Sequence, residues 1–170
     1  MSLAAAAVGR SDAPLSTVST GAYGHWDINV AVALATVLVV ALCVLLHYEG
    51  LSWLSRGLLR LQGRARRHML RGIFGVLVLH VLEIWIFGLA VFVLQQTDPR
   101  FGQIHGIDPG SLLDYVYFSA VTYTTVGFGD VIPTGPLRFL VGTEALAGFV
   151  LITWSASFTF LEMQRYWKRD

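Results

Sequence analysis

Long apolar runs alternate with short polar and basic segments along the whole chain. Three of these runs, residues 28–46, 72–94 and 137–160, are close to the roughly 20 residues that an α-helix needs to cross a bilayer. A fourth run, residues 112–124, is apolar and aromatic but too short to cross. The pattern predicts an all-α membrane protein with three transmembrane helices and one re-entrant helix.

The edges of the first run carry residues that suit the membrane interface. Trp26 precedes the run, and His47 and Tyr48 follow it, so that amphipathic rings would lie at both surfaces of the bilayer. We therefore expect residues 26–48 to form a peripheral transmembrane helix. Residues 1–25 are rich in Ala, Ser, Thr and Gly, lack the basic start and long apolar centre of a signal peptide, and are expected to form a flexible tail.

Arginine and lysine are unevenly distributed between the ends of the predicted spans. Residues 49–71 interleave six arginines with leucine and tryptophan, which is typical of a cytoplasmic amphipathic linker resting on anionic lipid, although a specific lipid-sensing or nucleic-acid-binding patch is an alternative. Three more basic residues follow residue 160, against three on the opposite side of the membrane. The positive-inside rule then places the N-terminus outside and the C-terminus in the cytoplasm of a multi-pass protein of the cell inner (plasma) membrane.

Composition supports the membrane class and limits the chemistry. Apolar residues make up 55% of the chain and charged residues 14%, and the charges lie in blocks between uncharged runs. The single cysteine, Cys43, excludes an intrachain disulfide and is interpreted as a packing residue. The net charge of +1 says little about partners; we expect no nucleic-acid partner and no small-molecule substrate, and no set of residues indicates covalent catalysis or a cofactor.

The short apolar run is preceded by turn residues and a helix-start signal. Asp98-Pro99 and Asp108-Pro109-Gly110 mark a turn-rich segment over residues 95–111. Ser111 and Asp114 have the S-x-x-D spacing of a capping box, which predicts that the re-entrant helix begins there. Its C-terminal end, with the negative half of the helix dipole, would then point into the membrane and favour a cation.

The segment from Thr124 to Asp130, which follows this helix, carries the strongest chemical signal in the chain. Gly127 and Gly129 can both adopt φ > 0, and alternation with residues at φ < 0 can turn successive carbonyl oxygens toward one side. Such a ladder of oxygens can replace the water shell of a potassium ion. The predicted K+ ligands are the Thr125 hydroxyl and the carbonyls of Thr125, Val126, Gly127 and Phe128. A phosphate-binding loop is excluded because Gly129 is followed by Asp130 rather than by lysine.

The same seven residues resemble the signature filter of potassium channels, with Phe128 at the position of the usual tyrosine or phenylalanine. The segment Glu144–Gly148 resembles the inner helix of the small bacterial two-helix potassium channels, in which Gly148 matches the supposed gating hinge. The resemblance covers residues 73–166. It implies a pore domain over residues 72–166, made of an outer helix, a pore helix, a filter and an inner helix.

The resemblance implies a potassium-selective channel that transports K+ passively through a homotetrameric pore in membrane lipid. K+ would be the permeant ion, and no cofactor is expected. The filter would be formed by Thr125, Val126, Gly127, Phe128 and Gly129 and supported by Thr124, Asp130 and Tyr117. The first span lies outside the resemblance, so its role is not assigned. It carries no arginine or lysine, which predicts weak voltage dependence.

Ionisable residues within the predicted spans are few and need an explanation, because a charge in the bilayer is costly. His80 and Glu83 are three residues apart and share one helix face. A buried hydrogen-bonded pair is the favoured interpretation, and proton sensing or metal binding is the alternative, with too few other ligands evident at this depth. Glu144 lies at a similar depth and is also expected to be structural. For Gly148, a hinge and close helix packing are equally compatible with the sequence.

Two other function classes share parts of this pattern. A nonselective cation channel has the same architecture, but would more plausibly carry a polar residue in place of Phe128. A non-conducting membrane scaffold or a polytopic enzyme would use His80, Glu83 and Glu144 as its site, and would need more convergent polar residues at one depth than the sequence offers.

Overall fold

The computed structural model describes residues 26–59 and 65–167, and almost all of this chain is helical. Its elements in order are α1 (Trp26–Leu59), α2 (Ala65–Thr97), the 3-10 helix η2 (Pro99–Phe101), β1 (Ile104–His105), α3 (Leu112–Tyr123), β2 (Ile132–Pro133) and α4 (Leu137–Trp167). Within the described residues, three segments are long and apolar enough to cross a membrane: Trp26–Gly57, Met69–Thr97 and Leu137–Gln164. The chain is an all-α multi-pass membrane protein, as predicted.

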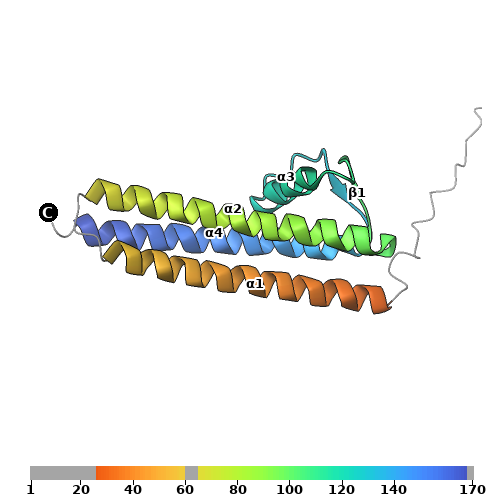
Figure 1. Ribbon diagram of the computed structural model, residues 1–170, viewed down its shortest axis with the longest axis horizontal. Helices are drawn as coiled ribbons and strands as arrows, with labels where there is room; N and C mark the ends of the chain where they lie inside the picture. Colours follow the sequence, from red (N-terminus) through yellow and green to blue (C-terminus); the bar gives the residue numbers. More distant parts are fainter. Residues whose placement is uncertain (1–25, 60–64, 168–170) are drawn as a thin grey trace, which may run out of the picture.

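The three long helices run side by side along the length of the molecule (Figure 1). α1 packs against both α2 and α4, whereas the short α3 packs against α2 and α4. In Figure 1, α3 and β1 lie on the side of the bundle away from α1, near the end where α1 begins and α2 ends. The short apolar run therefore forms a helix that packs beside two membrane spans, as the sequence predicted for a re-entrant helix.

The first helix runs past the boundary expected at Tyr48, and the division into a span and a basic linker stays a prediction. α1 continues without interruption to Leu59 and α2 already begins at Ala65, so most of residues 49–71 belongs to the ends of two long helices. The segment after Tyr48 contains no proline, and continuing the helix keeps its backbone hydrogen bonds made. Residues 60–64 and the expected flexible tail, residues 1–25, lie outside the described residues.

The helices bury a narrow apolar core and leave much apolar surface exposed. Core residues include Cys43, which is fully buried as the packing interpretation requires, together with Phe87, Val91, Tyr115 and Leu140. Large apolar side chains remain exposed along all three long helices, for example Leu34, Phe74 and Phe149. Exposed apolar surface of this extent suits lipid or further copies of the chain rather than water.

A two-stranded antiparallel sheet connects the segment after α2 to the segment before α4. Ile104 pairs with Pro133, and His105 pairs with Ile132. The sequence analysis treated this region as turns only and did not predict the pairing. Gly106 adopts φ +94°, and a Cβ there would overlap the backbone oxygen of Asp130, so only glycine permits this close approach of the two segments.

The start of α3 differs in detail from the predicted capping box. Ser111 is the N-cap residue, but its side chain makes no bond to the helix backbone. The Ser111 hydroxyl instead donates to Asp114 at 3.0 Å, and the other Asp114 oxygen accepts from the backbone N–H of Asp108 at 2.9 Å. The carboxylate of Asp114 thus fixes the preceding turn through Asp108. The Ser111 hydroxyl bonds the same carboxylate instead of the helix backbone.

Candidate functional site

The loop that follows α3 folds back onto the end of that helix. The backbone N–H of Thr125 donates to the carbonyl of Thr122 at 2.9 Å, and the N–H of Gly127 donates to the carbonyl of Val121 at 3.0 Å. The Thr124 hydroxyl donates to the carbonyl of Ala120 at 2.7 Å, still within the last turn of the helix. These bonds satisfy the terminal carbonyls of α3 and hold the start of the loop at the helix end.

The backbone of the loop has the unusual dihedral angles that the sequence predicted for its glycines. Gly127 has φ +51° and Gly129 has φ +81°. Thr125 has φ +60°, which the sequence analysis did not expect and which is the one positive φ at a non-glycine position among the described residues. This conformation costs roughly 1–3 kcal/mol for a β-branched residue and is typical of functional sites.

The whole segment from Thr124 to Asp130 is exposed in the single chain. The side chain of Val126 is 54% exposed and that of Phe128 is 70% exposed. Within one chain, the ring of Phe128 is therefore not packed behind the loop.

One side-chain contact ties the far end of the loop to α3. The hydroxyl of Tyr117 donates to Asp130 at 2.7 Å. Tyr117 lies in the middle of α3, so this bond spans the loop from its supporting helix to its last residue. This hydrogen bond is compatible with the supporting role predicted for both residues, and that role stays a prediction.

α4 passes very close to the end of α3. A Cβ at Gly148 would overlap the carbonyl oxygen of Tyr123 and lie against its ring, so this glycine permits the two backbones to approach. Four residues earlier, the buried Glu144 contacts the hydroxyl of Ser119 on α3, which also lies 2.8 Å from the backbone oxygen of Ile84 on α2. The observed geometry supports close packing at Gly148, and the hinge stays a prediction.

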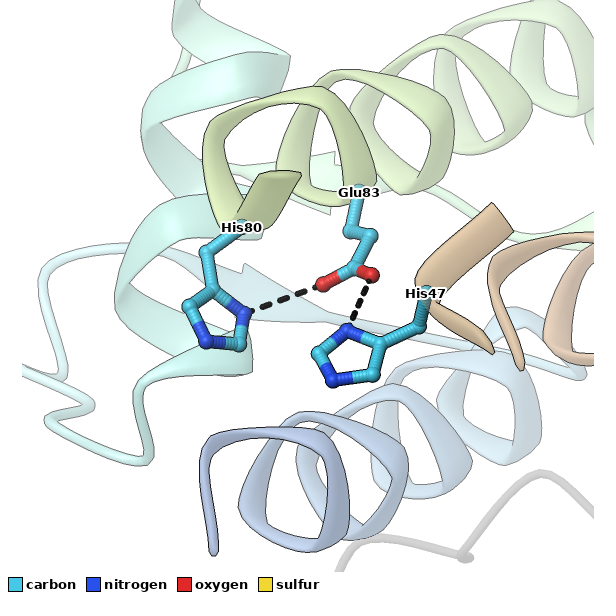
Figure 2. A group of neighbouring side chains, drawn as sticks. All are labelled: His47, His80 and Glu83. Carbon is cyan, nitrogen blue, oxygen red and sulfur yellow. Dashed lines mark hydrogen bonds and ion pairs between the residues drawn. The ribbon is translucent and has the colours of Figure 1, made fainter. Parts of the chain in front are cut away.

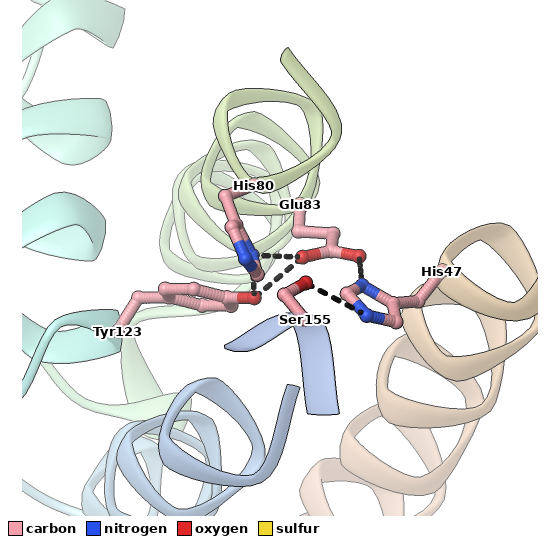
Figure 3. A network of polar contacts seen from close by, with 5 residues as sticks. All are labelled: His47, His80, Glu83, Tyr123 and Ser155. Carbon is pink, nitrogen blue, oxygen red and sulfur yellow. Dashed lines mark hydrogen bonds and ion pairs between the residues drawn. The ribbon is translucent and has the colours of Figure 1, made fainter. Parts of the chain in front are cut away.

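A second polar cluster lies beside the end of α3 and joins all four helices (Figure 3). Glu83 is fully buried and accepts hydrogen bonds from His47 on α1, His80 on α2 and the hydroxyl of Tyr123 on α3. The Nε2 atom of His47 lies 3.2 Å from the hydroxyl of Ser155 on α4. The expected partnership of His80 and Glu83 is confirmed by this geometry.

The sequence analysis missed the other three members of this cluster. It placed His47 at the membrane interface, but the structure buries it completely, because α1 extends well beyond it. Tyr123 and Ser155 are ordinary residues of apolar runs in the sequence, and only the packing of the helices brings them to Glu83. The pair of His80 and Glu83, three residues apart on one predicted span, was the available signal in the sequence.

One of the three membrane-spanning helices, α4, packs closely against the re-entrant helix α3, which ends at an exposed glycine loop. This arrangement is that of a pore-forming membrane protein. The chain belongs to an ion channel family: the family model Ion_trans_2, described as "Ion channel", matches residues 79–165, which is just over half of the chain. Membership of this family also confirms the prediction that the chain is not an enzyme.

Two relatives are similar to parts of the chain. The inward rectifier potassium channel Kirbac3.1 of Paramagnetospirillum magnetotacticum is 40% identical over 63 residues, which are 36% of this chain and 21% of that protein. Potassium channel K1 of Plasmodium berghei (strain Anka) is 30% identical over 92 residues, which are 54% of this chain and 4% of that protein. The chain thus spans a small fraction of either relative. No solved structure matches it.

Proposed function

We propose that this protein is a potassium-selective channel whose filter is the loop from Thr125 to Gly129. The observation that carries the proposal is the loop itself: a Thr-Val-Gly-Phe-Gly segment at the end of a re-entrant helix, with positive φ at both glycines and one face open. The K+ ligands are the Thr125 hydroxyl and the backbone carbonyls of Thr125, Val126, Gly127 and Phe128. Both relatives described above are named as potassium channels, which supports the same ion.

The functional unit in this proposal is a homotetramer. One loop cannot surround an ion, and four copies around an axis would place four sets of oxygens about it. The exposure of Phe128 in the single chain supports this arrangement, because a neighbouring copy can cover the ring. α3 and α4 would line the axis, α2 would lie outside them, and α1 would form the lipid-facing periphery.

The proposed orientation places the N-terminus outside the plasma membrane and the C-terminus in the cytoplasm. The basic residues of the sequence support it, because they gather where α1 ends, where α2 begins and after residue 160. The loop and the small sheet would then face outward. K+ is the permeant ion and no cofactor is part of the proposal.

Cation efflux from liposomes tests the selectivity directly. The purified full chain is reconstituted into liposomes with an outward gradient of K+, Rb+ or Na+. Cation efflux is followed through the proton influx that balances it, which a pH-sensitive dye reports. We expect K+ and Rb+ flux and hardly any Na+ flux. In the Gly127→Ala variant flux should fall strongly, because alanine at φ +51° is strained although no neighbouring atom lies within 4 Å of the added carbon.

Gly110→Ala is the matched control, since Gly110 lies in the turn before α3 without a positive φ, and its added carbon would meet Asp108 at an ordinary 3.5 Å. This variant should conduct like the wild type. Equal Na+ and K+ flux in the wild type would favour a nonselective cation channel. Absence of any flux from a stable tetramer would favour a non-conducting membrane scaffold.

A further inference from the structure

The buried cluster around Glu83 contains a set of side chains that are common ligands of transition metals. His47 approaches from α1, and His80 and Glu83 approach from one face of α2, with ring nitrogens turned toward the carboxylate (Figure 2). The Nδ1 atom of His47 lies 2.8 Å from one carboxylate oxygen, and the Nδ1 atom of His80 lies 3.0 Å from the other. Two imidazoles and a carboxylate are a ligand set found at zinc sites.

The spacing of these atoms is close to that of a tetrahedral site. A metal–ligand distance of about 2.0–2.1 Å places neighbouring ligands about 3.3 Å apart. Each of His47, His80 and Glu83 offers one ligand atom, and these three atoms lie within 4.8 Å of one another. The ring centres of the two imidazoles are 5.4 Å apart. Two imidazoles bound to one tetrahedral ion have ring centres about 5 Å apart. Small side-chain shifts therefore suffice to admit an ion.

A fourth oxygen ligand lies at the same place. The hydroxyl of Tyr123 is 3.0 Å from Nδ1 of His80 and also bonds Glu83. This oxygen therefore lies where a fourth ligand would be needed, beside the Glu83 carboxylate. The sequence analysis set a metal site aside because His80 and Glu83 alone are too few, and the structure supplies His47 and Tyr123.

The outer shell and an access route are also present. When Nδ1 of His47 binds a metal, the proton of that ring moves to Nε2, which can then donate to the Ser155 hydroxyl 3.2 Å away. Such a bond orients a metal-binding histidine and raises its basicity. His80 and Ser155 both line an open groove of about 390 Å³ between α2 and α4, so the cluster borders the surface of the chain.

We propose that His47, His80 and Glu83, with Tyr123, form a binding site for a divalent cation of the Zn²⁺ class. The ion would clamp α1 and α2 to the last residue of α3, immediately before the exposed loop. This gives α1, whose role the sequence does not assign, a direct mechanical link to the candidate filter. Mg²⁺ and Ca²⁺ would bind poorly, because they prefer sites made of oxygen ligands alone.

Direct metal binding to the full chain in detergent micelles tests the proposal without any ion flux, so its outcome is independent of the proposed channel activity. The protein is stripped with a chelator and titrated with Co²⁺, whose visible absorption distinguishes tetrahedral from octahedral coordination, and Zn²⁺ is then added as competitor. We expect one tetrahedral Co²⁺ per chain, displaced by Zn²⁺ and not by Mg²⁺. Affinity should fall at least tenfold in His47→Gln and in His80→Gln.

His105→Gln is the matched control, because His105 lies exposed on β1 away from the cluster, and this variant should bind like the wild type. Ser155→Ala keeps every ligand and should weaken binding without changing the stoichiometry. A wild-type protein that gives no tetrahedral Co²⁺ spectrum would overturn the proposal whether or not any variant folds. So would unchanged binding in folded His47→Gln and His80→Gln proteins, judged by their elution in size-exclusion chromatography.

Discussion

Replacement of Gly148 by alanine tests whether this glycine serves close packing between α3 and α4. A Cβ at this position would overlap the backbone oxygen of Tyr123 and would also lie 2.9 Å from its ring. The obstructing atom belongs to the backbone and cannot move aside by a change of rotamer. The two helices must therefore separate or bend locally to admit one methyl group.

The expected change follows from two opposing contributions. Overpacking of this kind costs about 1–3 kcal/mol, and the upper part of that range applies because the backbone must move. Alanine is favoured over glycine in a helix interior by about 1 kcal/mol. We therefore expect Gly148→Ala to lower the free energy of unfolding by about 1–2 kcal/mol.

Two other glycines provide matched controls for the measurement. A Cβ at Gly75 would lie 2.9 Å from a terminal carbon of Leu54, a flexible side chain that can rotate away. A Cβ at Gly57 would meet no atom within 4 Å. Gly75→Ala should be close to neutral, and Gly57→Ala should stabilise the protein by up to about 1 kcal/mol through helix propensity alone.

Denaturation of the purified protein in mixed micelles, followed by circular dichroism, gives the free energy of unfolding for each variant. K+ flux measured on the same samples separates stability from conduction. If Gly148→Ala were as stable as Gly57→Ala but conducted poorly, the packing argument would be refuted and the hinge interpretation would gain support. A destabilised variant that still conducts would support packing.

Three further predictions concern the filter loop and the topology. Tyr117→Phe removes the hydrogen bond to Asp130, which contributes about 0.5–1.5 kcal/mol. K+ flux should then decay faster than in the wild type, and equal decay would contradict a supporting role. Phe128→Asp should admit Na+ as well as K+ in the liposome assay, because the aromatic ring no longer packs against a neighbouring copy; retained selectivity would contradict this. Reporters fused before Met1 and after Asp170 should be active outside and in the cytoplasm, respectively, and the reverse result would contradict the proposed orientation.

The sequence determined the elements of this fold well because each depends on local chemistry. Apolar runs of bilayer length become helices, since a single segment can satisfy its own backbone in lipid only as a helix. The shorter run before Thr124 became α3, and the two glycines of the loop adopted positive φ as their lack of a Cβ allows. The residues proposed as the filter come from the same seven-residue string.

Helix ends and long-range contacts could not be obtained in this way. The arginine-rich segment after Tyr48 was expected to form its own element, but α1 continues into it as far as Leu59, because no proline interrupts the helix. The pairing of β1 with β2 involves short segments separated by the whole of α3. Two-residue strands carry no periodicity, so only the folded loop determines their register.

The cluster around Glu83 shows most clearly what the tertiary structure decided. From sequence, His80 and Glu83 form a pair on one helix face, and His47 marks a membrane edge. In the fold, α1 crosses α2 at the depth of Glu83, and the end of α3 brings Tyr123 to the same carboxylate. A buried carboxylate must find hydrogen-bond donors, but which helices supply them depends on how the helices cross, and that is set by packing over their full length.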